Sequence, residues 1–122
     1  MEYEPFKGNA LSWKLSKSVI ELTLHRPPAN EIGRVMLAEM EQFVTALESD
    51  SSEASVLIIY SQLKSGFSAG GDLREMYALL RDASPAERTG IRDYLERSHR
   101  MLNAIDASPL VTCGFGPISL VP

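Results

Sequence analysis

The stretch Phe67–Met76, FSAGGDLREM, connects a short apolar run to an amphipathic one. The run before it, Val56–Tyr60, is continuously apolar and rich in β-branched residues, which is typical of a strand covered on both faces. The run that follows the two glycines, Asp72–Arg81, repeats apolar residues at helical spacing. A strand, a glycine turn and a helix N-terminus leave unpaired backbone N–H groups at the mouth of a sheet, where the helix dipole adds partial positive charge. The stretch therefore predicts a place that binds anions or a developing oxyanion.

Strands and helices alternate along the rest of the sequence. The predicted strands cover residues 10–15, 18–25 and Val56–Tyr60, with a turn at Lys17–Ser18, and a last strand opens at Leu110–Cys113. The predicted helices cover Arg34–Glu48 and Asp72–Arg81, and a third helix runs from a capping box at Ser84–Glu87 to about Asp106. This alternation predicts one α/β domain over residues 1–122, with crossover connections between strands.

Composition excludes several classes of protein. With 44% hydrophobic and 23% charged residues, the 122-residue chain fits an ordinary globular domain. A net charge of -4 does not indicate a nucleic-acid-binding protein, which typically carries an excess of basic residues. No run approaches the ~20 apolar residues of a membrane span, and the N-terminus shows no secretory signal. The single cysteine, Cys113, cannot form an internal disulfide, so we expect a reducing, cytoplasmic setting. Because Cys113 lies in an apolar strand, we expect it to be a small buried hydrophobe.

Four segments carry a resemblance to a known family. In chain order they are Arg26–Asn30 after the first two strands, the helix with Met36, Leu37 and Leu47, the run Gly66–Leu73, and Ser108–Cys113 with Gly116. Together they resemble the crotonase family, the enoyl-CoA hydratase/isomerase superfamily, over residues from about 10 to 118. The resemblance implies a ClpP/crotonase-type spiral of ββα units, and trimers or hexamers (pairs of trimers) as the usual assemblies.

The resemblance also implies a chemistry. Members of the family act on acyl-CoA thioesters, with hydration of a 2-enoyl-CoA (a lyase reaction) or isomerisation of its double bond as the main candidates, as in fatty acid metabolism. Two backbone N–H groups hold the thioester oxygen as it becomes an enolate. Coenzyme A enters as part of the substrate, and neither a metal nor a separate cofactor is implied.

Site residues carry over by position. Gly71 matches the first oxyanion donor, and a glycine there lets the backbone approach a ligand without a Cβ in the way. The neighbouring residues match positions on the CoA side (Asp72, Leu73 and Arg74) and near the adenine and pantetheine (Ala29, Ser68 and Gly70).

The sequence departs from the family pattern at its end. The second donor of the family is a glycine a few residues beyond Gly116, where this chain has Leu120, Val121 and Pro122. In this register Pro122 falls on the donor glycine, and proline has no N–H to donate. No Asp or Glu follows Asp106, so the acid/base carboxylates of the family are missing.

Two interpretations follow from these departures. The chain is either the N-terminal, truncated portion of a longer enzyme, or a non-catalytic fragment or pseudoenzyme that serves CoA binding or assembly. In either case we expect an incomplete spiral, with the strand Val56–Tyr60 and the last strand lacking their usual covering.

Several residues have simpler interpretations. Asp72 fits a first-turn acid favoured by the helix dipole, and Arg74, like Arg26 and Lys64, fits either a phosphate contact or a solvated surface. His25 and His99 stand apart from any nucleophile motif, and with one cysteine they lack the spacing of a zinc site. A nucleotide-binding α/β domain unrelated to crotonases is a third interpretation, based only on the strand–glycine–helix pattern.

We expect the pure 122-residue chain to hydrate a 2-enoyl-CoA little or not at all. The physical reason is that the loss of one oxyanion donor alone lowers kcat by roughly 10²–10³, and the carboxylates are missing as well. The fall in ultraviolet absorbance of the enoyl thioester measures the rate. Turnover near the ~10 s⁻¹ of a typical enzyme would refute this expectation.

Overall fold

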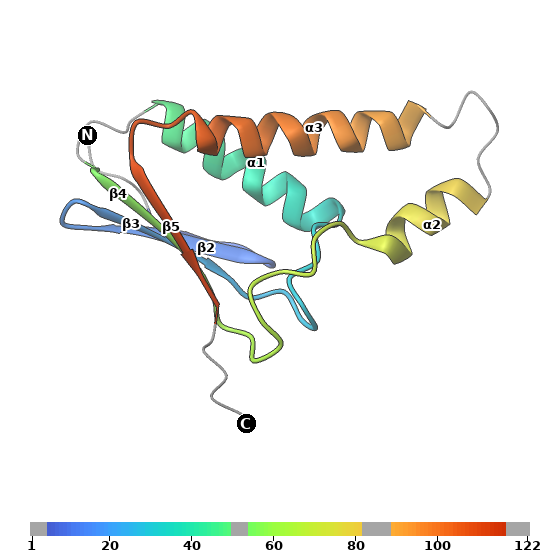
Figure 1. Ribbon diagram of the computed structural model, residues 1–122, viewed down its shortest axis with the longest axis horizontal. Helices are drawn as coiled ribbons and strands as arrows, with labels where there is room; N and C mark the ends of the chain where they lie inside the picture. The colour runs from blue at the N-terminus through green and yellow to red at the C-terminus, as the bar shows by residue number, and fades with distance from the viewer. Residues whose placement is uncertain (1–4, 50–53, 82–88, 117–122) are drawn as a thin grey trace.

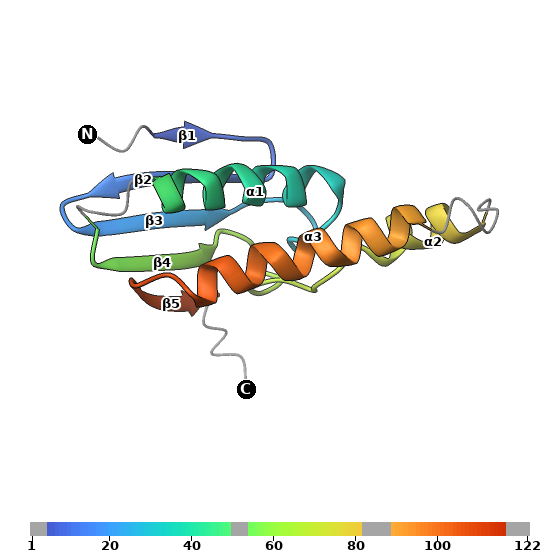
Figure 2. The ribbon, with the colours of Figure 1, turned by 90° about the horizontal axis from the view of Figure 1, so that it is seen from above.

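The fold is a five-stranded mixed sheet with helices packed on it (Figures 1 and 2). The computed structural model describes residues 5–49, 54–81 and 89–116. Its elements are β1 (Phe6–Lys7), β2 (Leu11–Ser16), β3 (Val19–Leu24), α1 (Arg34–Ser49), β4 (Val56–Ser61), α2 (Leu73–Arg81), α3 (Thr89–Asp106) and β5 (Val111–Phe115). The predicted α/β alternation is confirmed, β1 was not predicted, and the predicted ends that lie within the described residues are shifted by at most two residues. The capping box at Ser84–Glu87 lies outside the described residues.

The strands lie in the order β1-β2-β3-β4-β5. The first three are antiparallel, whereas β4 pairs parallel with both β3 and β5. The hairpin between β2 and β3 turns at the predicted Lys17–Ser18, with Ser16 opposite Val19 and Lys17 at a positive φ of 59°. The parallel pairs require crossovers, and these are α1 between β3 and β4, and α2 with α3 between β4 and β5.

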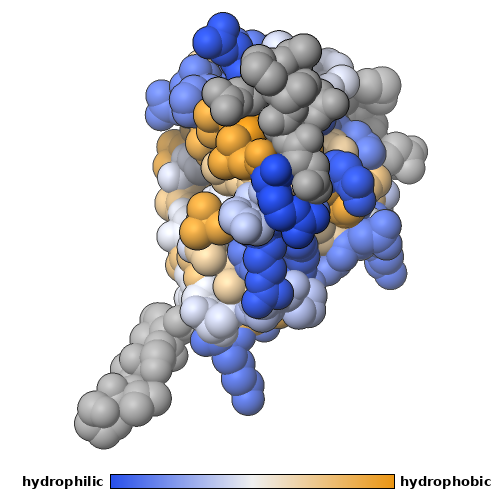
Figure 3. Space-filling view, turned by 90° about the vertical axis from the view of Figure 1, so that its right-hand side faces the viewer, coloured by the Kyte–Doolittle hydropathy of each residue, from blue (hydrophilic) through white to orange (hydrophobic). Residues whose placement is uncertain are grey.

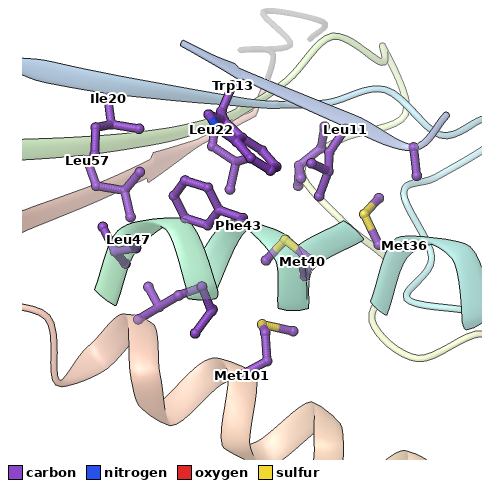
Figure 4. Close-up of a cluster of buried hydrophobic side chains, with 14 of the residues drawn as sticks. Leu11, Trp13, Ile20, Leu22, Met36, Met40, Phe43, Leu47, Leu57 and Met101 are labelled. Carbon is purple, nitrogen blue, oxygen red and sulfur yellow. The ribbon is translucent and has the colours of Figure 1, made fainter. Parts of the chain in front are cut away.

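The hydrophobic core lies between the sheet and helix α1 (Figure 4). Phe43 of α1 is fully buried, and its ring meets the edge of Trp13 at a centroid distance of 5.3 Å. Trp13 in turn stacks on Phe6 at a ring-centroid distance of 4.2 Å. Such aromatic pairs add roughly 0.5–1.5 kcal/mol beyond the area that they bury.

A buried carboxylate fixes the start of β2 to α1. Glu39 is 7% exposed and accepts backbone N–H bonds from Asn9, Ala10 and Leu11 at 2.9, 2.8 and 3.1 Å. Three donors compensate for the burial of this polar group. The helical pattern of α1 does not reveal this role, because the partners of Glu39 lie 28 to 30 residues earlier in the chain.

Helices α1 and α3 lie on the same face of the sheet, with α3 on the side of β4 and β5 (Figures 1 and 2). Every residue of β5 is exposed, as predicted for the last strand. Strand β4 is better covered than predicted, since Leu57 is fully buried and the strand lies between β3 and β5. The prediction of a buried Cys113 is wrong: its strand is an edge strand, and the thiol is exposed.

Helix α2 also presents apolar side chains to the outside. Leu73, Tyr77 and Leu80 recur at helical spacing and are 75%, 64% and 53% exposed. Figure 3, which shows the end of the molecule where α2 lies, has hydrophobic side chains at the surface among charged ones. Apolar surface of this extent, together with an unpaired strand edge, favours association.

We therefore expect the chain to self-associate in solution at micromolar concentration, measured by sedimentation velocity. Val111→Lys in β5, at a side chain that is 64% exposed, should shift the distribution toward monomer because a charge on an edge strand opposes pairing. Val35→Lys on α1, at a side chain that is 40% exposed, is the matched control and should leave the distribution unchanged. A monodisperse wild-type monomer would count against this expectation.

Candidate functional site

The loops that follow β3 and β4 leave the same edge of the sheet, because these strands are parallel. Asn30 joins the two loops. Its side chain is fully buried, and its Nδ2 donates to Ser61 Oγ at 2.8 Å and to the Phe67 carbonyl at 2.9 Å. Its Oδ1 accepts the Arg26 N–H at 2.8 Å. Asn30 has a positive φ of 53°, a conformation that asparagine tolerates better than most residues.

The predicted ligand-binding residues Ala29, Ser68 and Gly70 come together in these loops. The Ala69 N–H donates to the Ala29 carbonyl at 2.9 Å. The Ser68 hydroxyl donates to the Asn30 carbonyl at 2.8 Å and accepts the Gly70 N–H at 3.0 Å. The hydroxyl of Ser68 is thus occupied in shaping the loop, and Gly70 has a φ of +84° that favours glycine.

Gly71 forms a single parallel bridge with Ile32. The Ile32 N–H donates to the Gly70 carbonyl at 2.7 Å, and the Asp72 N–H donates to the Ile32 carbonyl at 3.1 Å. In such a pair Ile32 bonds to the residues on either side of Gly71, so the N–H of Gly71 itself points away from Ile32. Among the described residues, none accepts a hydrogen bond from this N–H. The predicted oxyanion donor is therefore exposed and unpaired in the described structure.

Asp72 is the N-cap residue of α2. Its Oδ1 accepts the N–H groups of Arg74 and Glu75 at 3.0 and 3.2 Å, and its Oδ2 pairs with Arg26 Nη2 at 2.7 Å. Arg26 Nη1 also donates to the Glu31 carbonyl at 2.6 Å. The hydrogen bond from Arg26 holds the pKa of Asp72 below its usual value against the opposing effect of burial, and the Glu75 and Arg74 N–H groups add to the lowering.

This geometry favours the simpler interpretation of Asp72, a first-turn acid. The residue is 5% exposed and its carboxylate pairs with Arg26, so a contact of Asp72 with CoA stays a prediction. The same ion pair engages Arg26, whereas Arg74 and Lys64 are exposed, and a phosphate contact of either stays a prediction. Leu73, two residues after Gly71, is exposed, and its contact with a ligand stays a prediction.

Helix α2 also caps helix α1. Glu75 Oε2 accepts the Arg34 N–H at 2.7 Å at the first turn of α1, where a carboxylate is favoured by the helix dipole. A Cβ on Gly33 would clash with that oxygen, so a larger residue at this position would push the Glu75 side chain away from the Arg34 N–H. The capping fixes the position of the loop that contains Ile32 relative to α2.

Two hollows lie near the bridge. One, of about 480 Å³, is bounded by α1, α2 and α3, and its wall includes Leu37, Met76, Leu79 and Tyr94. A Cβ on Gly71 would lie 3.3 Å from Tyr94 Oη and 3.5 Å from Met76 Sδ, which places this hollow beside the predicted donor residue. The other, of about 180 Å³, is almost entirely apolar and is lined by residues that include Ile32, Ile59, Phe67 and Leu102.

Sequence reasoning missed the residues that hold the donor in place. The missed residues are Asn30, Ile32, Glu75 and Tyr94, whose hydroxyl donates to the Ile32 carbonyl. A signal existed for Asn30, since an asparagine after Pro-Pro-Ala is typical of a turn with positive φ. For the other three, no local pattern distinguishes them from ordinary helix or loop residues.

The remaining candidates lie elsewhere. His25 Nε2 is 2.9 Å from Ser12 Oγ on the neighbouring strand, and His99 is exposed on α3. Within residues 5–49, 54–81 and 89–116, no group of three His, Cys, Asp or Glu side chains is placed to hold a metal ion. No helix in this part of the chain is long and apolar enough to cross a membrane. The predicted coincidence of Pro122 with a second donor position lies outside the described residues.

Comparison with known proteins settles the family. The family model for enoyl-CoA hydratase/isomerase matches residues 14–106. The chain belongs to this family. Among curated proteins, a probable enoyl-CoA hydratase of Bacillus subtilis is 35% identical over 71 residues, which are 58% of this chain and 27% of that protein. Family membership decides against the unrelated nucleotide-binding domain.

Solved structures share the fold of this enoyl-CoA hydratase/isomerase family member. DspI of Pseudomonas aeruginosa superimposes with a TM-score of 0.71 at 25% identity, over 89% of this chain and 39% of its own. An enoyl-CoA hydratase from Shewanella pealeana gives 0.72 at 23% identity, over 87% of this chain and 38% of its own. The predicted crotonase-like fold is confirmed, and the chain spans about 39% of these first structural relatives.

We expect Asp72→Asn to lower the free energy of unfolding by about 1.5–3 kcal/mol at pH 7, the range for hydrogen bonds to charged groups. Because the folded-state pKa of Asp72 lies below its unfolded value, the ion pair stabilises the fold above about pH 4, and its contribution is lost as pH falls through the folded pKa. Denaturant midpoints of wild type and variant should therefore converge in acid.

Asp106→Asn is the matched control for this comparison, since Asp106 is exposed at the end of α3. It should change the midpoint little at either pH. Equal loss of stability for Asp72→Asn at pH 7 and in acid would show that the charge of Asp72 does not matter.

Proposed function

We propose that the site binds an acyl-CoA thioester and that the Gly71 N–H donates to the thioester oxygen as it becomes an enolate. The observation that carries the proposal is the direction of this N–H: the Ile32 bridge turns it outward, and no described residue accepts it. It lies one residue before the N-cap of α2, where the partial positive charge of the helix favours an oxyanion. Family membership supports the substrate class.

The chemistry explains why a fixed donor matters. Removing or adding a proton next to a thioester builds negative charge on its oxygen, and a preorganised donor lowers that barrier. Hydration and isomerisation of an enoyl-CoA both pass through such a state, so the proposal covers lyase and isomerase chemistry alike. The carboxylates that lie near Gly71 are already engaged, Asp72 by Arg26 and Glu75 by the Arg34 N–H, and neither is proposed as the acid or base.

The surroundings of Gly71 suggest how a ligand lies. The acyl group would enter the hollow of about 480 Å³ whose wall includes Met76 and Tyr94 beside Gly71. On the other side, the exposed Leu73 and Arg74 would meet the pantetheine and a phosphate of CoA. The loop backbone at Ala29, Ser68 and Gly70 would complete the CoA side.

A trimer or hexamer, a cytoplasmic location and a part in fatty acid metabolism belong to the same proposal and rest on the family alone. A second candidate, a non-catalytic role in CoA binding or assembly, is favoured by the fully exposed edge strand β5 and by the apolar outer side of α2.

The donor role is tested with two ligands that differ at one atom, butyryl-CoA and the thioether butyl-CoA, which has no carbonyl oxygen. Calorimetry should show that the wild-type protein binds the thioester about fivefold more tightly than the thioether, because one net hydrogen bond contributes about this much. Gly71→Pro removes the N–H and should abolish this preference. Gly71→Ala is the control: its added Cβ should weaken the binding of both ligands, but it keeps the N–H and should therefore preserve the preference.

Comparing ligands within each variant cancels any general disturbance of the loop by proline. A wild-type protein that binds both ligands equally would refute the donor role, and so would a Gly71→Pro variant that still prefers the thioester. Failure of wild type to bind either ligand would refute the assignment of an acyl-CoA site to this chain.

A further inference from the structure

Tyr94 reaches from α3 to the bridge between Ile32 and Gly71. Its hydroxyl donates to the Ile32 carbonyl, the same oxygen that accepts the Asp72 N–H at 3.1 Å. A Cβ on Gly71 would lie 3.3 Å from Tyr94 Oη, so the phenol is in contact range of the donor residue itself. The side chain is half-buried and packs against the hydrophobic core.

Helix α3 holds this phenol in a fixed place. One turn beyond Tyr94, Arg97 forms a two-pronged ion pair with Glu41 of α1, in which its Nε donates at 3.0 Å. Asp93 lies 3.7 Å from the same guanidinium. The hydrogen bond from Arg97 lowers the pKa of Glu41 and keeps its carboxylate charged. The stretch of α3 that carries Tyr94 is thereby tied to α1, which packs on the sheet.

The orientation of the Gly71 peptide groups depends on Ile32. Ile32 makes a hydrogen bond on each side of Gly71. The Ile32 N–H donates to the Gly70 carbonyl, and the Ile32 carbonyl accepts the Asp72 N–H. The Gly71 N–H belongs to the Gly70–Gly71 peptide, which the Ile32 N–H holds, whereas the Ile32 carbonyl holds the Gly71–Asp72 peptide. A rotation of that carbonyl would turn the Gly71–Asp72 plane and, through the shared Cα of Gly71, would change the direction of the Gly71 N–H. A second donor on that carbonyl, supplied by a separate helix, restricts the rotation.

We propose that Tyr94 is a positioning residue for the Gly71 oxyanion donor, acting through the carbonyl of Ile32; this inference rests on the proposed function of the site. A phenol carries a single O–H group, and that of Tyr94 already donates its hydrogen bond to the Ile32 carbonyl. Tyr94 is therefore not a second donor to the ligand. Its effect is to fix the direction of the Gly71 N–H relative to the helices that bound the neighbouring hollow.

The first test needs no ligand. Tyr94→Phe keeps the ring and removes the hydroxyl, and amide hydrogen exchange followed by NMR should show about fivefold faster exchange at Asp72, the effect of one hydrogen bond on the local opening. Tyr77→Phe, at a side chain of α2 that is 64% exposed, is the matched control and should leave the Asp72 rate unchanged. Tyr94→Met, a second variant without a hydroxyl, should behave as Tyr94→Phe does.

The second test reports the donor itself. Dimethylaminocinnamoyl-CoA absorbs further to the red when its carbonyl oxygen accepts a hydrogen bond. At saturation, the red shift of the bound probe should fall by at least half in Tyr94→Phe, while the shift in Tyr77→Phe equals that of wild type. If Tyr94 only stabilised the fold, its replacement by Phe would lower the melting temperature or the affinity for the probe and would leave the red shift of the bound probe unchanged.

The outcomes separate the two proposals. A wild-type red shift that persists in Tyr94→Phe, with unchanged Asp72 exchange, would overturn the positioning role and leave the donor role of Gly71 standing. No red shift in wild type would overturn the donor role, and the exchange rate at Asp72 would still decide whether Tyr94 restrains the bridge.

Discussion

The backbone bridge between Ile32 and Gly71 is the contact on which the arrangement of the site depends. It joins the loop after β3 to the loop after β4 and turns the Gly71 N–H outward, because both neighbouring peptide groups are already bonded to Ile32. An unpaired N–H is rare when it is buried, but Gly71 is exposed at the N-terminal end of α2, where a ligand can reach this group. A group that binds a developing charge must be available and fixed, and this bridge provides both properties.

Buried and half-buried polar groups hold the bridge in place. Asn30 fixes the two loops to each other, the Arg26–Asp72 pair fixes the start of α2, and Tyr94 ties the bridge to α3. Each of these groups is satisfied by partners far away in the chain, so that its burial does not leave an unpaired donor or acceptor. The hydrophobic core between the sheet and α1 supports the elements from which these loops leave, but the site itself is shaped by hydrogen bonds.

The sequence predicted the elements better than their surroundings. The strand Val56–Tyr60, the glycine turn and the helix after it follow from local patterns, and the structure has them within two residues. Cys113 was predicted to be buried because its neighbours are apolar, yet strand pairing alone decides that β5 lies at an edge. The sequence did not decide whether Asp72 contacts a ligand or serves as a first-turn acid, since its partner Arg26 is 46 positions away.

The sequence by itself determined the α/β class, the resemblance to crotonases and the position of the candidate donor, because periodicity, glycine turns and helix starts are encoded within a few residues. Only the tertiary structure decided where the Gly71 N–H points and what holds it. Those facts depend on contacts such as Tyr94 to Ile32, which are 62 residues apart in the chain. No local pattern specifies such pairs, since they arise only when the parallel strands and their crossover helices have packed together.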